Sequence, residues 1–345
     1  MKFDYIVVGL GLAGLAFAEY LKEEGKSFVV YEDSSQTSSL VAGGTYNPVI
    51  LKRYTQVWNA HKQLKVALPF YARLEDKFND RFDKKYRALK IFKSTGDQNK
   101  WFSALDKPII SAYMKEEIIK EKINGVIGDF GFGELKGNGR IDTTRLIYRY
   151  REYLKFDNRL VENNFLYDEL IIHKNKLTYQ NIEATKIVFC EGFGLKNNPF
   201  FNYLPLNGTK GETLTIYAPD LKVDFLLKSS VFVLPLGNHL YKIGATFNRE
   251  DKTILTTEKG RLELEEKLKK VISVAYTVED QAAGVRPTVM DRRPLVGVHS
   301  EYSNLAVLNG LGTRGVMIAP TVAKQLLNYL ERGVELDKEI DIKRF

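Results

Sequence analysis

The pattern of hydrophobic and polar positions in the first 32 residues predicts a strand, a helix and a second strand. Residues 5–8 (YIVV) form a short, β-branched apolar run that is typical of a buried parallel strand. Apolar side chains then recur at helical spacing over residues 15–21, with Glu19 on the opposite, polar side. Residues 27–31 (SFVVY) form the second apolar run. The start of the chain therefore predicts a βαβ unit.

A glycine-rich turn, GLGLAG, joins the first predicted strand to the helix. Gly9 permits the tight turn, Gly11 lets the backbone approach a pyrophosphate, and Gly14 lets the helix and strand pack closely. Glu32 ends the second strand, where a carboxylate accepts hydrogen bonds from an adenosine ribose. This arrangement predicts a Rossmann-type site that disfavours NADP but leaves NAD and FAD open. The predicted cofactor-binding residues here are Gly9, Gly11, Leu12, Ala13, Gly14, Glu32 and Asp33.

The next segments depart from simple βαβ alternation. Residues 34–45 are rich in small residues and tightest at Gly43 and Gly44, which predicts either a loop along the cofactor or an ordinary linker. Residues 50–120 carry aromatic residues at spacings that predict a mostly helical insertion.

The second half of the chain returns to an α/β pattern and then changes to antiparallel strands. A helix is predicted after Asp142 or Thr143, followed by a strand (KIVFC) with a glycine turn at Gly192, where Cys190 is expected to be a core residue. Residues 205–280 predict antiparallel strands and a charged helix at about 257–272. A last apolar strand, residues 305–308, leads into a second glycine loop that opens a helix.

These elements predict an α/β fold with a parallel sheet, plus an α+β second domain with an antiparallel sheet and a helical insertion. We expect a discontinuous cofactor domain made of residues 1–49, 139–204 and 284–345. Residues 50–138 and 205–283 are expected to form the substrate domain.

Composition narrows the class of protein. The 345 residues are 44% hydrophobic and 27% charged, which indicates a globular chain. No apolar stretch reaches the roughly 20 residues of a membrane span, and the N-terminus lacks a signal-peptide layout. The single cysteine excludes an intramolecular disulfide. We therefore expect a cytoplasmic protein with no membrane span.

The net charge of +8 is concentrated in one segment. Residues 51–100 contain thirteen lysine or arginine residues against five acidic ones, so the rest of the chain is neutral overall. Such a segment is either a solvated surface, which we favour, or a docking face for an acidic substrate or nucleic acid. No metal-ligand or RNA-binding motif accompanies it, so no metal site is predicted.

The motifs together resemble the D-amino-acid oxidase and glycine oxidase family of FAD-dependent enzymes. The N-terminal GxGxxG unit, the CEGFG turn, the GVRP and DRRPLVG segments and the final NGLGTRG loop occur in that order over nearly the whole chain. The final loop is also similar to the oxidase half of the bifunctional enzyme that modifies the tRNA wobble uridine. The resemblance implies FAD as the cofactor, contacted at its ring end by the second glycine loop.

The resemblance also implies site residues. The flavin-ring end is expected to lie against Gly312, Thr313, Arg314, Gly315 and Val316, whose backbone N–H groups suit a negatively charged reduced ring. Arg286 of GVRP is expected to bind a substrate carboxylate, because its planar fork matches that group. Arg314 and Tyr241 are the other catalytic candidates, as a nearby positive charge and as a hydrogen-bond donor.

The resulting hypothesis is an FAD-dependent oxidoreductase that oxidises the C–N bond of an amino acid or secondary amine. The resemblance implies hydride transfer to flavin N5 followed by hydrolysis of the imine. Two alternatives stay open: oxidation of a glycine-like modification on tRNA uridine, and a flavin-binding protein without turnover. The expected partner is a small amine or amino acid, with tRNA as the less favoured one.

Overall fold

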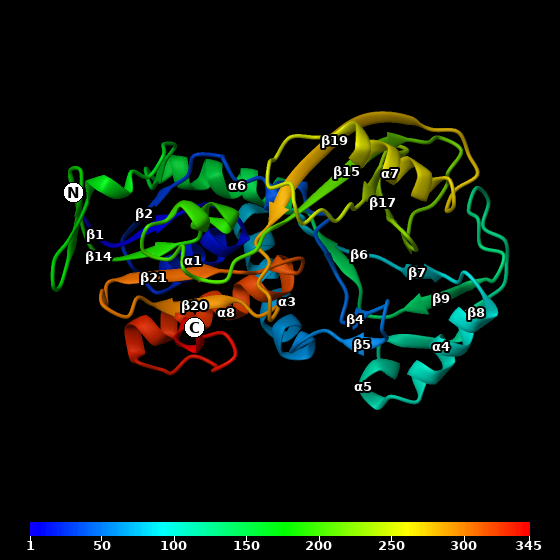
Figure 1. Cartoon of the computed structure of the whole chain (residues 1–345), viewed down its shortest axis with the longest axis horizontal. Coiled ribbons are helices and arrows are strands. Elements are labelled where there is room, and N and C mark those ends of the chain that lie inside the picture. Colours follow the sequence, from blue (N-terminus) through cyan, green and yellow to red (C-terminus); the bar gives the residue numbers. More distant parts are fainter.

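The computed structural model describes residues 1–345, and its strands form two eight-stranded sheets that lie side by side (Figure 1). In the first sheet the strand order is β11-β2-β1-β14-β13-β12, with β21 also pairing with β14 and β20 with β21. Its strands are β1 (Lys2–Val8), β2 (Phe28–Tyr31), β11 (Leu160–Val161), β12 (Leu170–Ile172), β13 (Leu177–Tyr179), β14 (Ile182–Phe189), β20 (Leu295–Val298) and β21 (Leu305–Asn309).

The middle of the first sheet is parallel and buried on both faces. Strands β11, β2, β1, β14 and β21 pair in parallel, whereas β12, β13 and β20 pair antiparallel. Along β1, Tyr5 and Val7 enter one hydrophobic cluster, and Ile6 and Val8 enter another on the opposite face. The predicted buried parallel strand is confirmed, because each face has its own core.

Four helices build the larger of these two cores. They are α1 (Leu12–Glu23), α3 (Ala60–Phe78), α6 (Thr143–Phe156) and α8 (Gly315–Arg332). Glu19 of α1, predicted on a polar face, is instead buried: its carboxylate accepts hydrogen bonds from Lys77 Nζ at 2.7 Å and Tyr150 Oη at 3.0 Å. The prediction was wrong because α3 and α6 supply partners from distant sequence. None of the helices combines the length and apolar character needed to cross a bilayer.

Helix α8 contains a proline close to its start, and α3 compensates for it. Pro320 has no N–H to donate to the carbonyl of Val316, four residues earlier. The hydroxyl of Tyr71, on α3, donates to that carbonyl at 2.9 Å and is fully buried. This contact fixes the start of α8, which carries the second glycine loop.

The second sheet has the order β19-β15-β18-β17-β16-β7-β9-β8, and only the β16–β7 pair is parallel. One face packs against α7 (Glu258–Leu268), and part of the other face is covered by α4 (Thr95–Leu105) and α5 (Pro108–Ser111). Its strands are β7 (Ala88–Ile91), β8 (Met114–Ile119), β9 (Phe132–Leu135), β15 (Thr209–Tyr217), β16 (Leu226–Lys228), β17 (Phe232–Gly237), β18 (Leu240–Gly244) and β19 (Thr277–Arg286).

Short elements complete the structure. A three-stranded sheet, β3-β10-β6, and a two-stranded one, β4-β5, accompany the large sheets. The short elements are α2 (Ser38–Val41), β3 (Thr45–Tyr46), β4 (Val49–Ile50), β5 (Thr55–Gln56), β6 (Asp83–Lys85) and β10 (Gly139–Ile141), with 3-10 turns at Tyr167–Glu169, Gly192–Asn197 and Ile342–Arg344.

The predicted fold class is confirmed, and the insertion needs a correction. Residues 50–120 are not mostly helical, because β5, β6, β7 and β8 lie in this range and β7 pairs with β16 from the second half of the chain. Helix α3 packs in the core of the first sheet rather than against the second. We propose the expected division into two discontinuous domains with this one change, that α3 belongs to the first.

Candidate cofactor and substrate site

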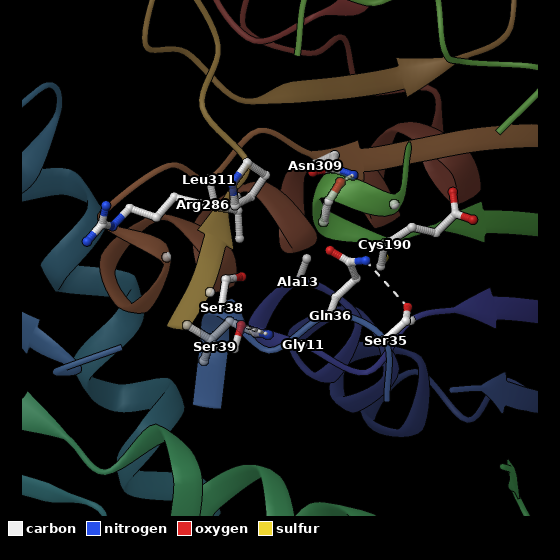
Figure 2. A pocket seen from close by; sticks show the side chains of 18 of the residues that line it. Gly11, Ala13, Ser35, Gln36, Ser38, Ser39, Cys190, Arg286, Asn309 and Leu311 are labelled. Atoms are coloured by element: carbon white, nitrogen blue, oxygen red, sulfur yellow. Dashed lines mark hydrogen bonds between the residues drawn. The ribbon is translucent and has the colours of Figure 1, made fainter. Parts of the chain in front are cut away.

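A cavity of about 870 Å³ lies between the two sheets, within the size range of cofactor and ligand sites. Its lining comes from the ends of β1, β2, β14 and β21 in the first sheet and from β15, β17 and β19 in the second. Figure 2 shows Arg286 extending to one side, and Gln36 and Cys190 on the other. The cavity is therefore elongated, with the first glycine loop toward one end and Arg286 toward the other.

Close backbone approaches explain the first glycine loop. Gly9 has a φ of +95°, and a Cβ there would stand 2.6 Å from the carbonyl oxygen of Cys190. A Cβ on Gly14 would overlap the carbonyl oxygen of Gly9. Gly14 is therefore a packing residue outside the lining, whereas Gly9, Gly11, Leu12 and Ala13 line the cavity.

Glu32 is fixed at the first-loop end of the cavity. Its carboxylate accepts hydrogen bonds from the backbone N–H of Leu10 and, at 2.7 Å, from that of Ser34. Burial raises the pKa of this carboxyl group, and the two N–H donors oppose that rise. Glu32 and Asp33 both line the cavity, so the predicted acid is placed where a ribose hydroxyl can reach it.

The small-residue loop after Glu32 follows the cavity wall. It contains the single-turn helix α2, and Ser39 Oγ accepts a hydrogen bond from the N–H of Leu12 at 3.2 Å, at the start of α1. Gly43 and Gly44 line the cavity, and a Cβ on Gly44 would overlap the carbonyl oxygen of Ile141. Sequence reasoning missed Ser38 and Ser39, because nothing in a serine-rich loop distinguishes a wall residue from a linker.

Gly312 of the second glycine loop opens into the cavity, whereas a Cβ on Gly310 of the same loop would stand 2.7 Å from the Val289 side chain. Gly312 has a φ of +59°, and a Cβ there would meet no atom within 4 Å. The N–H groups of Thr313, Gly315 and Val316 at the start of α8 have no hydrogen-bond partner in the chain. These residues line the cavity together with Gly312. Free donors at a helix N-terminus can stabilise negative charge on a bound ring.

Arg286 supplies the cationic end of the lining. Its Nη1 donates to the carbonyls of Lys210 at 3.4 Å and Thr246 at 3.3 Å, and no carboxylate pairs with it. The guanidinium lies over Gly211, where a Cβ would overlap it, and near the ring of Phe247. Burial lowers the pKa of Arg286, but an arginine stays charged. Much of its fork is thus available to an anion in the cavity.

The other two catalytic candidates do not line the cavity. Tyr241 is buried among the residues that pack against α7, and its hydroxyl donates to the carbonyl of Leu221. Neighbouring side chains of a strand point to opposite faces of the sheet, so Lys242 points away from the face that carries Tyr241. The sequence predicted that Tyr241 lies on a sheet, but not which face of that sheet meets the cofactor. The expected catalytic role of Tyr241 is corrected to a core role. Arg314 is the N-cap of α8, between Thr313 and Gly315, and is not itself a lining residue.

The cavity also has acidic walls that the sequence did not indicate. Residues 163–168 and Glu191 join Gly192 in the lining. Burial raises the pKa of Glu191 to about 7, although Tyr167 and Asn198 donate hydrogen bonds to its carboxylate.

Sequence reasoning also missed two aromatic lining residues, Phe232 and Phe247, which lie on the wall formed by the second sheet and the segment after it. The CEGFG motif predicted Gly192 as a cofactor-binding residue. Residues 163–168 contain no motif from which their place in the lining could be predicted.

Comparisons with known proteins identify the family and the fold. The model of the FAD-dependent oxidoreductase family matches residues 4–329. Glycine oxidase of Bacillus subtilis is 22% identical, over 98% of this chain and 94% of that enzyme. The tRNA 5-methylaminomethyl-2-thiouridine biosynthesis bifunctional protein MnmC of Marinobacter nauticus is also 22% identical, over 94% of this chain but 55% of that protein. The fold matches that of glycine oxidase from Geobacillus kaustophilus with a TM-score of 0.81 at 16% identity, covering 100% and 98% of the two chains.

The match to the family covers almost the entire chain, and the cavity has the glycine loops, the acid and the free N–H donors that FAD requires at its two ends. The prediction of FAD as cofactor is confirmed, as is the prediction of an oxidoreductase. The chain belongs to the family of FAD-dependent oxidoreductases.

Proposed function

We propose that this FAD-dependent oxidoreductase oxidises the C–N bond of an amino acid or secondary amine whose carboxylate is bound by Arg286. The observation that carries the proposal is the partly buried guanidinium of Arg286, which faces the cavity without a carboxylate partner. A charge in this position is stabilised when a planar anion accepts two of its N–H groups. We assign the adenosine end of FAD to Glu32 and the first glycine loop, and the ring end to residues 312–316.

Bound FAD would supply the acceptor for the hydride that leaves the carbon next to the substrate nitrogen. The residues of the chain orient that carbon and exclude water from it. Arg286 fixes the carboxylate, while Phe232 and Phe247 supply apolar walls. The N–H groups of Gly315 and Val316 would stabilise negative charge on the flavin ring.

No general base is needed in this arrangement. No histidine or lysine lines the cavity, so the substrate amine must reach it in its neutral form. Loss of the hydride leaves an imine, and water then splits the imine into a carbonyl compound and an amine or ammonia.

Anaerobic reduction of the purified holoprotein tests the proposal. Glycine, sarcosine, D-amino acids, proline and a glycine-modified uridine are added separately, and absorbance of the oxidised flavin is followed. Bleaching by one amino acid or secondary amine is the expected result and defines the substrate class. A flavin that stays oxidised with every amine would contradict the proposal and favour a flavin-binding protein without turnover.

A tRNA-linked substrate is the second candidate, favoured by the similarity to MnmC and by free cations in residues 51–100. Six of the thirteen basic side chains there form ion pairs, so the docking face would rely on others such as Lys62 and Lys65 on α3. Salt-sensitive tRNA binding that K62E/K65E abolishes, with K222E as the control, would support it. Absence of binding at low salt would exclude it.

A further inference from the structure

A connection at the Arg286 end of the cavity is fixed by a buried ion pair. Residues 245–257 join β18 to α7 and contain no helix and only an isolated β-bridge, at Asn248. Ala245, Thr246 and Phe247 line the cavity, whereas most of the remaining residues are exposed to solvent. An exposed connection of this length is normally mobile, so the contacts that fix its first residues bear on substrate binding.

Lys210 of β15 holds the middle of this connection. Its side chain is buried, and its Nζ donates to Asp251 Oδ2 at 2.5 Å and to Thr253 Oγ1 at 3.2 Å. The backbone N–H and carbonyl of Lys210 also pair with Asn248, at 2.9 and 3.0 Å. The hydrogen bond from Lys210 is the main cause that lowers the pKa of Asp251 to about 2, so the pair is ionised at neutral pH.

Arg286 takes both of its hydrogen-bond acceptors from the structure that Lys210 holds. Its Nη1 donates to the carbonyl of Lys210 itself at 3.4 Å and to that of Thr246 at 3.3 Å. The ring centre of Phe247, the next residue along the connection, lies 5.8 Å from the guanidinium carbon of Arg286. A shift of this segment would therefore move an acceptor of Arg286 and the wall beside it together.

The far end of the connection is held by a different side chain. Glu212, two residues after Lys210 on β15, is buried, and its carboxylate accepts hydrogen bonds from the N–H and hydroxyl of Thr257 at 2.8 and 2.7 Å. Thr257 is the N-cap of α7, so Glu212 fixes the start of that helix. The Lys210–Asp251 pair is the one ion pair that involves the connection, and it acts on the part that follows the lining residues.

We propose that Lys210 is a positioning residue for substrate binding, and that its ion pair with Asp251 holds Thr246 and Phe247 where they orient Arg286 and flank the substrate. The inference rests on the proposed function, because it takes Arg286 to bind the substrate carboxylate. Lys210 is not a lining residue and acts through the Thr246 carbonyl and the Phe247 ring. Loss of the pair should therefore weaken binding of a carboxylate without removing the cation that binds it.

A carboxylate that cannot be oxidised tests this role independently of turnover. Methoxyacetate, an ether analogue of sarcosine, is titrated into the holoprotein, and the shift of the flavin spectrum gives its Kd. We expect D251A to raise this Kd about tenfold, because a small misplacement of the binding groups is sufficient for such a loss. Thermal unfolding of each holoprotein is followed in parallel as the measure of stability.

A double variant separates positioning from stability. D251A leaves the charge of Lys210 buried without a partner, whereas K210M/D251A removes both charges and should regain much of the lost stability. A positioning role predicts that the double variant still binds methoxyacetate about tenfold more weakly than the unaltered protein, because an apolar side chain makes no directional hydrogen bonds to the connection. A Kd that returns to the unaltered value together with stability, or one that is unchanged in D251A, would overturn the inference.

The ion pair between Lys90 and Asp97 is the matched control. It joins β7 to α4 with an Nζ–Oδ2 distance of 2.6 Å, is mostly buried, and involves no lining residue. D97A should lower the stability and leave the Kd of methoxyacetate unchanged. A rise in Kd as large as that in D251A would show that any loss of stability weakens binding, and would also overturn the inference.

The two proposals fail in different ways. In the flavin-reduction assay, K210M/D251A should raise the half-saturating amine concentration about tenfold and retain the limiting rate. If no amine bleaches the flavin but the double variant binds methoxyacetate more weakly, the proposed reaction is wrong and the positioning role stands. If an amine bleaches the flavin with the same half-saturating concentration in both proteins, the reaction stands and the positioning role is wrong.

Discussion

The two ends of the cavity differ in charge and in the reason for their glycines. At the first-loop end, the lining carries Glu32, Asp33, Asp168 and Glu191 and no lysine or arginine, while at the other end Arg286 is the one charged lining residue. Gly9 and Gly14 of the first loop are needed because backbone atoms approach closely, whereas Gly312 in the second loop faces open space. On the proposed function, the first end would hold hydroxyl groups of the cofactor and the second would receive the carboxylate of the substrate.

The largest expected effect comes from the close approach in the first loop. G14A puts a Cβ against the carbonyl oxygen of Gly9, so the strand and helix must separate. We expect a loss of at least about 4 kcal/mol in the free energy of unfolding, together with loss of flavin. Urea unfolding measures it. The control is G96A, also in a helix, where the nearest atom to a Cβ is the Ser94 hydroxyl at 3.6 Å. Equal stability of G14A and G96A would contradict the packing argument.

Glu191 tests the acidic character of the first-loop end of the cavity, because its carboxyl group is buried there. Burial raises its pKa to about 7 from an ordinary value of 4.5, so the folded protein holds a proton that the unfolded chain releases. The free energy of unfolding should therefore fall as pH rises from about 4.5 to about 7, by roughly 2–3 kcal/mol from this group. E191Q should remove that fall and be the more stable protein at pH 8.

Urea unfolding of both proteins at pH 5 and pH 8 checks the role of Glu191. E121Q, which alters an exposed carboxylate without an ion pair, should keep the pH dependence of the unaltered protein. Parallel pH curves for E191Q and the unaltered protein would show that Glu191 does not titrate in this range.

A smaller effect is expected from Glu32. E32A removes the acceptor that we assign to the ribose, and a hydrogen bond to a charged group contributes about 2 kcal/mol. The Kd of FAD for the apoprotein should rise about thirtyfold, measured by fluorescence during reconstitution. E335A, at an exposed site, is the matched control. An unchanged Kd for FAD in E32A would show that Glu32 makes no stabilising contact with the cofactor.

The smallest effect is expected at Gly312. G312A meets no neighbouring atom, so it should cost only the strain of a left-handed alanine, about 1 kcal/mol in the free energy of unfolding. Thermal unfolding of the holoprotein measures it. If G312A lowered the free energy of unfolding as much as G14A does, Gly312 would have to be packed as tightly as Gly14.

The sequence predicted local features of the site well and its distant pairings poorly. The βαβ unit, Glu32 and the opening of α8 are set by contiguous residues, so spacing alone indicated them. Glu19 and Tyr241 were assigned to the wrong surroundings because their neighbours come from α3, α6 and α7, which no local pattern locates. Tyr241 and Ile243 alternate with Lys242 and Gly244, so the apolar face was visible in the sequence, but not the helix that covers it.

The second sheet shows the same limit on a larger scale. Its only parallel pair joins residues 226–228 to residues 88–90, which are separated by more than a hundred positions. Phe232, which lines the cavity, pairs with Lys228 of β16 and so belongs to the same assembly. We therefore expect substrate recognition to depend on contacts that sequence periodicity does not encode, whereas the motifs of the proposed cofactor site are local in the sequence.

The most direct measurement for the central claim is anaerobic reduction of the flavin in R286M, using the amine that best reduces the unaltered holoprotein. The substrate concentration for half-maximal reduction rate should rise about a hundredfold, because a buried charge pair is lost, while the spectrum of the bound flavin is retained. R53M, at an exposed arginine without an ion pair, should behave as the unaltered protein. An unchanged half-saturating concentration in R286M would contradict the assignment of Arg286 to the substrate carboxylate.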